Sequence, residues 1–332
     1  MVLQWHIIKL PLKETFSISY GNYQYREALL VQLSHAGFTG YGECTAITYY
    51  HIDLQAFHQL LQRHEAVING WGMHHPFEFY SFLTQLQLPD FLKSALDCAY
   101  WDLFGKLEQR SFIEMNGIST HTMPVSSWTI SVAPVATQIQ KMQASAWPKF
   151  KVKCNGFDPV AIQTLVDSGY PISLDSNASF TPADCVGLQQ IQGIERILYA
   201  EQPMAVGPEN YNYLNATDAI NWMADEEALH VSDLVALLPH YRSVNVKVMK
   251  CGGLTPALEM VRTAKAMGFQ VMLGCMTEST VGISAGAVLA PLCDFADLDG
   301  SNLIANDIAT GTAIRNGSIE LASQPGLGIQ LK

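Results

Sequence analysis

Six charged residues recur at nearly constant spacing through the middle of the chain, and each ends a short apolar run. They are Lys151, Lys153, Asp175, Glu201, Asp225 and Lys247. From the second lysine onward the gaps are 22, 26, 24 and 22 residues. A strand, a helix and two loops fill a gap of that size. Because a parallel (β/α) barrel places its reactive groups at the carboxyl ends of successive strands, the spacing predicts both the fold and its working face.

The first two lysines, Lys151 and Lys153, are separated by one residue in FKVK. Side chains two apart on a strand share a face, so both should point into the mouth of the barrel. Neighbouring ammonium groups lower each other's pKa. A lysine that acts as a base at neutral pH needs a pKa of roughly 7–8. The motif alone leaves open an edge strand that exposes both lysines to solvent.

Three acids end the next three predicted strands: Asp175, Glu201 and Asp225. Carboxylates that converge without a partner repel one another, and a divalent cation removes that conflict. Mg²⁺ prefers oxygen ligands and retains several waters. We therefore expect these three residues to bind Mg²⁺. The alternative is a set of surface acids near loops.

Lys247 ends the sixth predicted strand, which lies opposite the second in a ring of eight. A substrate between these strands would have Lys153 on one face and Lys247 on the other. Two bases on opposite faces of one carbon invert a stereocentre by 1,1-proton transfer, and a metal ion stabilises the enolate between the two steps. Lys250 is a competing candidate on the same segment, but it follows the strand toward the Gly252–Gly253 turn.

A further acidic pair, Asp297 and Asp299, lies in FADLDG on the last predicted strand. The period-two rule places both side chains on one face, toward the pocket. Two open carboxylates across the mouth suit a cationic group such as a substrate ammonium. Without the wider context, the pair could also be part of a solvated loop.

Eight short apolar runs give the strand number of a closed barrel. They are residues 124–131, 149–153, 172–175, 197–201, 221–225, 243–247, 270–274 and 294–298. Three Asp/Thr–Pro pairs, at 158–159, 181–182 and 255–256, predict helix starts. Gly169 and Gly268 predict helix ends. We expect an α/β fold with a modified (β/α)8, TIM-like catalytic barrel over residues 118–300.

The first part of the chain, residues 1–117, has a different pattern. Strand-like runs at 5–10, 28–33 and 40–43 precede a helix with apolar spacing over 92–107. Strands followed by helices indicate a separate α+β capping domain. The tail, residues 301–332, is rich in turns and lacks a clear eighth helix, so we expect it to join the capping domain.

Composition excludes several classes of protein. The chain has 332 residues, of which 48% are hydrophobic and 15% charged, and its formal net charge is −11. An acidic chain is a poor partner for nucleic acid. No apolar run is long enough to span a membrane. The first residues lack the layout of a signal peptide, so we expect a cytoplasmic protein. A homo-oligomer is compatible with these features.

Taken together, the motifs resemble the enolase superfamily, and within it the muconate-lactonizing subgroup. FKVKCNG resembles the KxK strand of that family, and LDSN, AEQP and MADEE resemble its three metal-ligand strands. NVKVMKCGG resembles its sixth strand, with the base at the first lysine. YGECTA and LDCAYWDLFGK resemble its capping domain. The resemblance implies Mg²⁺ together with lysine bases.

Within the subgroup, the pair Asp297 and Asp299 is similar to the one with which dipeptide epimerases hold the substrate's α-ammonium. The resemblance implies that Thr129 and Lys151 also contact a small dipeptide, and that two further residues support the site from behind. Those residues are Asn177 and Glu226. Alternatives on the same scaffold are cycloisomerase, o-succinylbenzoate synthase and N-acylamino acid racemase. An inactive barrel that acts as a binding module is the alternative of another class.

The chain departs from the resemblance in one loop. Epimerases of Ala–Glu dipeptides carry an arginine where this sequence has Gly21, and Arg26 is the nearest basic residue. Tyr20, Tyr23 and Tyr25 would offer an aromatic wall, or would pack within the capping domain instead. We therefore expect dipeptides with small or apolar C-terminal residues, with an L-Ala-D/L-Glu epimerase as the alternative in which Arg26 enters the pocket.

Overall fold

The structure is a computed structural model that describes residues 1–18 and 21–332. It begins with an antiparallel sheet in the order β1-β2-β3, formed by Val2–Ile18, Gly21–His35 and Phe38–Thr45. Four helices follow: α1 (Leu54–Asn69), α2 (Pro76–Gln85), α3 (Asp90–Glu108) and α4 (Phe112–Asn116). The predicted strands at 5–10, 28–33 and 40–43 and the helix at 92–107 all lie within these elements, so those predictions are confirmed.

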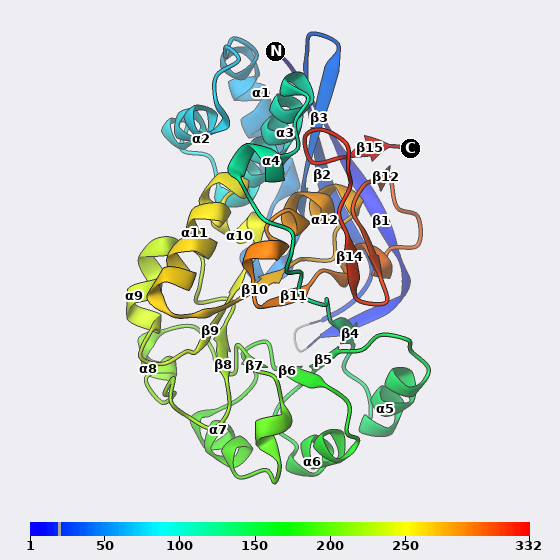
Figure 1. The fold of residues 1–332 in the computed structure, drawn as a ribbon, viewed down its shortest axis with the longest axis vertical. Coiled ribbons are helices and arrows are strands. Elements are labelled where there is room, and N and C mark those ends of the chain that lie inside the picture. Colours follow the sequence, from blue (N-terminus) through cyan, green and yellow to red (C-terminus); the bar gives the residue numbers. More distant parts are fainter. Residues whose placement is uncertain (19–20) are drawn as a thin grey trace.

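Helix α3 packs closely on strand β3 because two glycines leave no side chain between them. A Cβ added to Gly42 would lie 1.9 Å from the carbonyl oxygen of Ala95, and one added to Gly40 would lie 2.1 Å from that of Ala99. Apolar side chains on both sides of this contact, including Leu96, are fully buried. The sheet and the helix therefore form one layered core (Figure 1).

This contact predicts a large effect of a single methyl group. Gly42→Ala should lower the free energy of unfolding by roughly 1–3 kcal/mol, because the new Cβ meets backbone that cannot move aside cheaply. Urea denaturation followed by circular dichroism measures the change. Gly70→Ala is the matched control, since the nearest atom to its added Cβ is 3.4 Å away. Equal stability of the two variants would contradict this description of the contact.

The second part of the chain forms a parallel eight-stranded sheet whose order follows the sequence from β4 to β11. The strands are β4 (Trp128–Ile130), β5 (Phe150–Lys153), β6 (Ile172–Asp175), β7 (Ala200–Glu201), β8 (Trp222–Ala224), β9 (Ser243–Val246), β10 (Gln270–Gly274) and β11 (Phe295–Asp297). A parallel bridge between Ser126 and Ala296 joins the first and last strands. All eight predicted strands are confirmed, and the sheet is a nearly closed barrel.

Helices cover the outside of this barrel (Figure 1). They are α5 (Val135–Gln143), α6 (Pro159–Asp167), α7 (Pro182–Gln189), α8 (Pro208–Tyr211), α9 (Leu234–Leu237), α10 (Val248–Cys251), α11 (Leu254–Met267) and α12 (Thr280–Ala287). Asp158 and Thr181 cap α6 and α7 as predicted. Gly169 and Gly268 follow helix ends with positive φ, which is also as predicted.

The predicted start of a helix at Thr255 is wrong. Helix α11 begins one residue earlier, with Gly253 at the N-cap position. The side chain of Thr255 instead contacts α3, where its hydroxyl donates to Asp97 and accepts from the indole of Trp101. Asp97 also accepts a hydrogen bond from the Thr255 amide, so a carboxylate from the N-terminal region caps the helix.

The tail after β11 contains a 3₁₀ turn (Asp299–Leu303) and short strands in antiparallel pairs, β12 with β15 and β13 with β14. The strands are β12 (Ala309–Thr310), β13 (Ala313–Arg315), β14 (Ser318–Glu320) and β15 (Gln330–Leu331). The tail contacts the N-terminal region, since the Phe112 amide donates to Gly326 and the Lys106 ammonium donates to Ile329. The division into a capping domain of residues 1–117 with 301–332 and a barrel of 118–300 stays a prediction.

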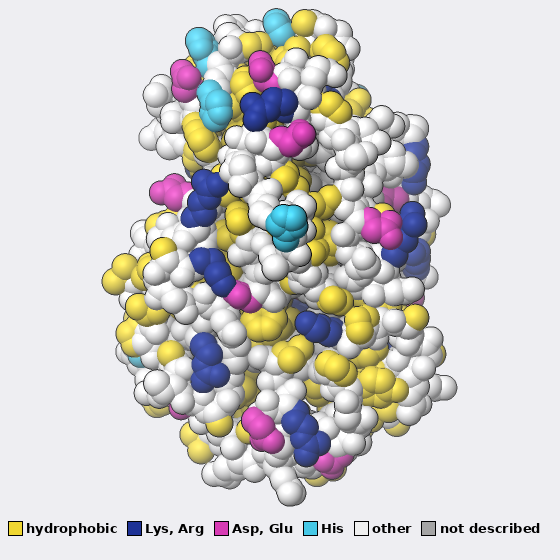
Figure 2. Space-filling view, in the orientation of Figure 1, with side chains coloured by type: hydrophobic (Ala, Val, Ile, Leu, Met, Phe, Trp, Pro, Cys, Tyr) yellow, Lys and Arg dark blue, Asp and Glu magenta, His cyan; other side chains and the backbone are white. Residues whose placement is uncertain are grey.

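The surface seen in Figure 2 carries basic and acidic side chains interspersed with one another. None of the helices within residues 1–18 and 21–332 is both long and apolar enough to cross a membrane.

Candidate active site

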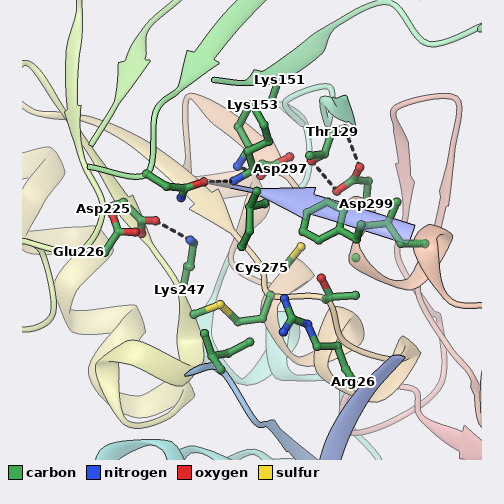
Figure 3. Close-up of a pocket in the computed structure, with 18 of the residues that line it drawn as sticks. Arg26, Thr129, Lys151, Lys153, Asp225, Glu226, Lys247, Cys275, Asp297 and Asp299 are labelled. Atoms are coloured by element: carbon green, nitrogen blue, oxygen red, sulfur yellow. Dashed lines mark hydrogen bonds and ion pairs between the residues drawn. The ribbon is translucent and has the colours of Figure 1, made fainter. Parts of the chain in front are cut away.

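A pocket opens where the carboxyl ends of the barrel strands meet the N-terminal region (Figure 3). Most of its charged side chains come from the barrel, including both predicted lysine bases and the acidic pair at the end of β11, whereas Arg26 comes from β2. Its apolar wall comes mainly from the N-terminal region and the loops after β10 and β11. The apolar side chains are Phe16, Ile18, Ile47, Tyr50, Met276 and Leu303. Barrel strand ends thus supply most of the charged side chains, and the N-terminal region covers the pocket with mainly apolar side chains.

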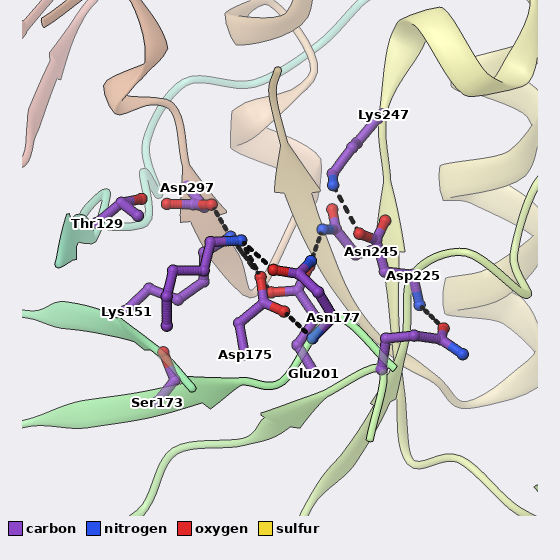
Figure 4. A network of polar contacts seen from close by, with 12 residues as sticks. Thr129, Lys151, Ser173, Asp175, Asn177, Glu201, Asp225, Asn245, Lys247 and Asp297 are labelled. Carbon is purple, nitrogen blue, oxygen red and sulfur yellow. Dashed lines mark hydrogen bonds and ion pairs between the residues drawn. The ribbon is translucent and has the colours of Figure 1, made fainter. Parts of the chain in front are cut away.

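Lys151 lies at the centre of the polar network (Figure 4). Its Nζ is 3.6 Å from Asp175, 3.3 Å from Glu201 and in direct contact with Asp297. Burial favours the neutral amine, but these three carboxylates outweigh it and raise the pKa of Lys151 well above its usual value. The predicted lowering of its pKa is therefore wrong in this state of the site, because its nearest neighbours are acids rather than Lys153.

Lys153 shares the inward face of β5 with Lys151, as the period-two rule predicts. Its Nζ is 2.5 Å from Asp175 Oδ2 and 3.2 Å from Asn177 Oδ1. The Asn177 amide in turn donates to Asp175 Oδ1 at 3.0 Å. Asn177 has a φ of 43°, a left-handed conformation that turns this amide toward the carboxylate. The loop after β6 therefore holds Asp175 and Lys153 in one fixed arrangement.

The three predicted metal ligands, Asp175, Glu201 and Asp225, are each about 1% exposed and lie on or beside adjacent strands. Burial raises the pKa of Glu201 to about 7, and Asp175 and Asp225 add to the effect. Glu201 Oε1 accepts a hydrogen bond from Asn245 at 2.6 Å. Its buried Oε2 accepts no hydrogen bond from the described residues.

The carboxylates fit a hard divalent cation by chemistry. They present oxygen ligands, repel one another electrostatically, and include the buried Glu201 Oε2 that lacks a hydrogen bond. Within residues 1–18 and 21–332, no group of three or more His, Cys, Asp or Glu side chains is arranged as a finished metal site. In this arrangement lysine ammonium groups contact each of the three carboxylates.

Lys247 follows β9, on the side of the barrel opposite β5. Its Nζ is 2.6 Å from Asp225 Oδ2. Burial favours the neutral amine, yet Asp225 and Glu201 raise the pKa of Lys247 above its usual value. A dication held by the same carboxylates would cancel the negative charge that causes this increase. Lys247 and Lys153 therefore face the pocket from opposed strands, each paired with a different acid.

The acid after Asp225, Glu226, also lines the pocket and is 6% exposed. Burial and the adjacent Asp225 charge raise the pKa of Glu226 to about 8. Its Oε2 is buried and accepts no hydrogen bond from the part of the chain that the structure describes. The side chain is thus close to Lys247 and available to a bound group (Figure 3).

The acidic pair after β11 reaches the pocket, although the strand ends at Asp297 and Asp299 begins the 3₁₀ turn. Thr129 fixes Asp299 by donating from its amide at 2.7 Å and from its hydroxyl at 3.2 Å. Burial and the charge of Asp297 raise the pKa of Asp299 to about 7. Asp297 Oδ2 contacts Lys151, whereas its buried Oδ1 accepts no hydrogen bond from the described residues.

Arg26 lies in the pocket wall and is 5% exposed. Its guanidinium stacks over the ring of Tyr23 with 3.6 Å between its central carbon and the ring centroid. Tyr25 is 45% exposed and faces Lys9, so it does not contribute to an aromatic wall. Tyr20 lies outside the described residues. Tyr50, which the sequence did not single out, lines the pocket instead.

The sequence did not single out Asn245, which lies behind the site and donates a hydrogen bond to Glu201. Lys250, the competing candidate base, holds Asp225 from the side away from the pocket. Asn245 could have been found by the period-two rule, since it precedes Lys247 by two residues on the same strand face. Gly274 on the neighbouring strand leaves room for its amide, because an added Cβ would lie 2.3 Å from the Asn245 side-chain oxygen.

Comparison with known proteins identifies both parts of the chain. Residues 6–117 match the model of the mandelate racemase / muconate lactonizing enzyme N-terminal domain. Residues 134–332 match the model of the enolase C-terminal domain-like family. An L-Ala-D/L-amino acid epimerase from Maribacter sp. is 35% identical over 97% of both chains. An L-Ala-D/L-Glu epimerase from Bacteroides thetaiotaomicron is 30% identical over 97% of this chain and 85% of its own.

Solved structures show the same architecture. A dipeptide epimerase from Enterococcus faecalis, complexed with Mg and L-Leu-L-Tyr, has a TM-score of 0.88 at 25% identity and covers 99% of this chain and 98% of its own. One from Methylococcus capsulatus, complexed with Mg and L-Arg-D-Lys, has a TM-score of 0.87 at 27% identity, over 98% of both chains. With both of its parts matched, the chain belongs to the mandelate racemase / muconate lactonizing enzyme family of the enolase superfamily.

Proposed function

We propose that the protein is a dipeptide epimerase that inverts the α-carbon of a dipeptide's C-terminal residue. The observation that carries this proposal is the position of two lysines on opposite sides of one pocket, Lys153 at the end of β5 and Lys247 directly after β9. The acidic pair Asp297 and Asp299 lines the same pocket. The epimerases among its relatives support the same reaction class, an isomerase acting on amino acid derivatives.

Lys153 and Lys247 would exchange the α-proton, one removing it and the other returning one to the opposite face. Each ammonium already contacts a carboxylate that can orient it, Asp175 in one case and Asp225 in the other. Asn177 adds a second contact to Lys153. The nearly complete burial of both lysines excludes bulk water, which limits loss of the transferred proton.

Asp175, Glu201 and Asp225 would hold Mg²⁺, the metal present in the related dipeptide epimerase structures. When bound, the cation supplies positive charge beside the substrate carboxylate and so makes the α-proton more acidic. Asn245 orients Glu201, and the Asn177 amide orients Asp175. These hydrogen bonds fix the orientation of the Glu201 and Asp175 carboxylates.

Asp297 and Asp299 would bind the free ammonium of the N-terminal residue. Asp297 Oδ1 is buried without a hydrogen bond from the described residues, so a donor from the substrate would satisfy it. Thr129 fixes Asp299, and Lys151 fixes the other oxygen of Asp297. The pair is thus rigid before a substrate binds.

Asp297→Asn is expected to lower kcat/KM for dipeptides by roughly tenfold to a hundredfold, since a charge-assisted hydrogen bond is worth about 1.5–3 kcal/mol. Steady-state kinetics with a dipeptide and with its N-acetylated form measure the effect, and thermal unfolding checks the fold. The N-acetylated form should be a poor substrate of the unaltered protein. Equal activity on both forms would argue against ammonium recognition and would favour an N-acylamino acid racemase.

The C-terminal side chain would lie against the apolar wall of the pocket, where Phe16, Ile47 and Met276 are found. We expect kcat/KM for dipeptides such as Ala–Phe to exceed that for Ala–Glu by about tenfold or more. An acidic side chain loses its hydration against this wall, and no bidentate hydrogen-bond partner among the described residues of the wall compensates for the loss. Kinetics on matched L,L-dipeptides test this expectation. Arg26, stacked on Tyr23, is the group that could reverse it.

The decisive variant is therefore Arg26→Ala. If the apolar wall sets specificity, the variant keeps the preference for uncharged dipeptides. A preference for Ala–Glu that is present in the unaltered protein and lost in Arg26→Ala would show that the arginine binds the glutamate side chain.

The reaction class itself is tested with a dipeptide library that is incubated in D₂O and analysed by mass spectrometry. If none of the dipeptides gained deuterium at the α-carbon, the result would contradict the proposed function.

A further inference from the structure

A second lysine lies one helical turn after Lys247 and has a different environment. Lys250 Nζ is 2.5 Å from Asp225 Oδ1, 2.5 Å from the Asp225 carbonyl oxygen and 3.0 Å from that of Asn245. An ammonium has three N–H donors, and three acceptors occupy them. Lys250 is 1% exposed and is not part of the pocket wall, whereas Lys247 is 9% exposed and is part of it.

Lys247 and Lys250 contact different oxygens of the Asp225 carboxylate. Lys250 contacts Oδ1 from behind, and Lys247 contacts Oδ2 from the pocket side. Because Lys250 also binds the Asp225 carbonyl, it fixes the backbone as well as the side chain of this residue. Rotation of the carboxylate would break a buried charge-assisted hydrogen bond, so Oδ2 remains the oxygen that faces the pocket.

The charges of the site indicate a second consequence. The carboxylate of Asp225 has two cationic partners, Lys247 on the pocket side and Lys250 outside the pocket. Asp175 and Glu201 contact Lys151 and Lys153 instead. This leaves Lys247 free of a permanent structural role, because another cation already stabilises buried Asp225.

We propose that Lys250 is a positioning residue, which fixes Asp225 so that Lys247 is oriented for proton transfer on its own face of the substrate. The proposal rests on the proposed function. It predicts an effect on one face of the substrate alone. Lys153 is oriented by Asp175 and Asn177, and within the described residues neither of these contacts Lys250. Loss of Lys250 should therefore impair the Lys247 face and leave the Lys153 face nearly unchanged.

Lys250→Met tests this with α-deuteration of each substrate isomer in D₂O at saturating Mg²⁺. The Lys153→Ala and Lys247→Ala variants first establish which isomer each lysine deprotonates. We expect exchange of the isomer served by Lys247 to fall roughly tenfold to a hundredfold, as for other small misplacements of catalytic groups. The exchange rate of the other isomer should stay within about twofold of its rate in the unaltered protein. An equal loss for both isomers, or no loss for either, would overturn the proposal.

Lys106→Met is the matched control, because Lys106 also binds one carboxylate, Asp102, and two carbonyl oxygens, those of Thr39 and Ile329, far from the pocket. It should alter stability without a difference between isomers. If Lys250→Met does not fold, Lys250→Arg replaces it. This variant should show the same difference between the two isomers, with a smaller loss of exchange rate.

A crystal structure of the folded variant gives a readout independent of substrate. The proposal requires Asp225 to leave its original orientation, and an unchanged Asp225 would overturn it. The two hypotheses can fail separately. Absence of dipeptide exchange in the unaltered protein counts against the proposed function, whereas symmetric exchange or an unmoved Asp225 in the variant counts against the role of Lys250.

Discussion

Lys153→Ala and Lys247→Ala are each expected to abolish net epimerisation of dipeptides, with losses in kcat of roughly 10² to 10⁴-fold or more. Inversion needs a base on each face of the α-carbon, and these lysines end opposed strands of the barrel. Among the described residues of the pocket wall, the one other lysine is Lys151, which three carboxylates hold and which therefore cannot replace either base. Polarimetry or chiral chromatography of the products measures the loss.

Each variant should still exchange the α-proton of one isomer with D₂O, because one base remains. The isomer that exchanges in Lys153→Ala should be the one that does not exchange in Lys247→Ala. Lys265→Ala, which removes a partly exposed lysine on α11, is the control and should retain full activity. Normal turnover in either active-site variant, or exchange of both isomers in both variants, would be incompatible with the two-base mechanism.

Removal of divalent metal with a chelator is expected to eliminate activity, and Mg²⁺ should restore it. Three buried carboxylates on adjacent strands repel one another, and a cation that binds them stabilises the folded state. At a Mg²⁺ concentration of about 100 times Kd, the free energy of unfolding should rise by about 2.7 kcal/mol. Calorimetric titration and thermal unfolding in chelator and in Mg²⁺ measure both effects.

Glu201→Gln is the sharpest single change at this site, because it removes a negative charge from a buried carboxylate whose Oε2 accepts no hydrogen bond from the described residues. We expect it to weaken Mg²⁺ binding and to lose the metal-dependent gain in stability. Glu195→Gln, in a 3₁₀ turn remote from the pocket, is the control. Full activity of rigorously metal-free protein would show that these carboxylates serve another purpose.

The sequence by itself determined the barrel and the strand ends that carry its charges. Apolar runs, their period, and the caps at Asp158 and Thr181 depend on neighbours within a few residues, so the sequence itself carries these signals. The period-two rule correctly placed Lys151 beside Lys153 on one face. Thr255 differs, because a contact with Asp97, 158 residues away in the sequence, determines its role instead of helix capping.

Only the tertiary structure decided which acidic side chain forms an ion pair with which basic side chain. The ion pair between Lys151 and Asp297 links side chains of the second and eighth barrel strands, and the pKa of this lysine rises where the sequence alone predicted a decrease. Lys250 follows the strand as predicted, yet packing turns its ammonium back onto Asp225. Arg26 reaches the pocket wall from a strand of the N-terminal region. Periodicity gives the face on which a side chain lies, but its partner depends on which distant strand packs against that face, and burial then sets the strength of their interaction.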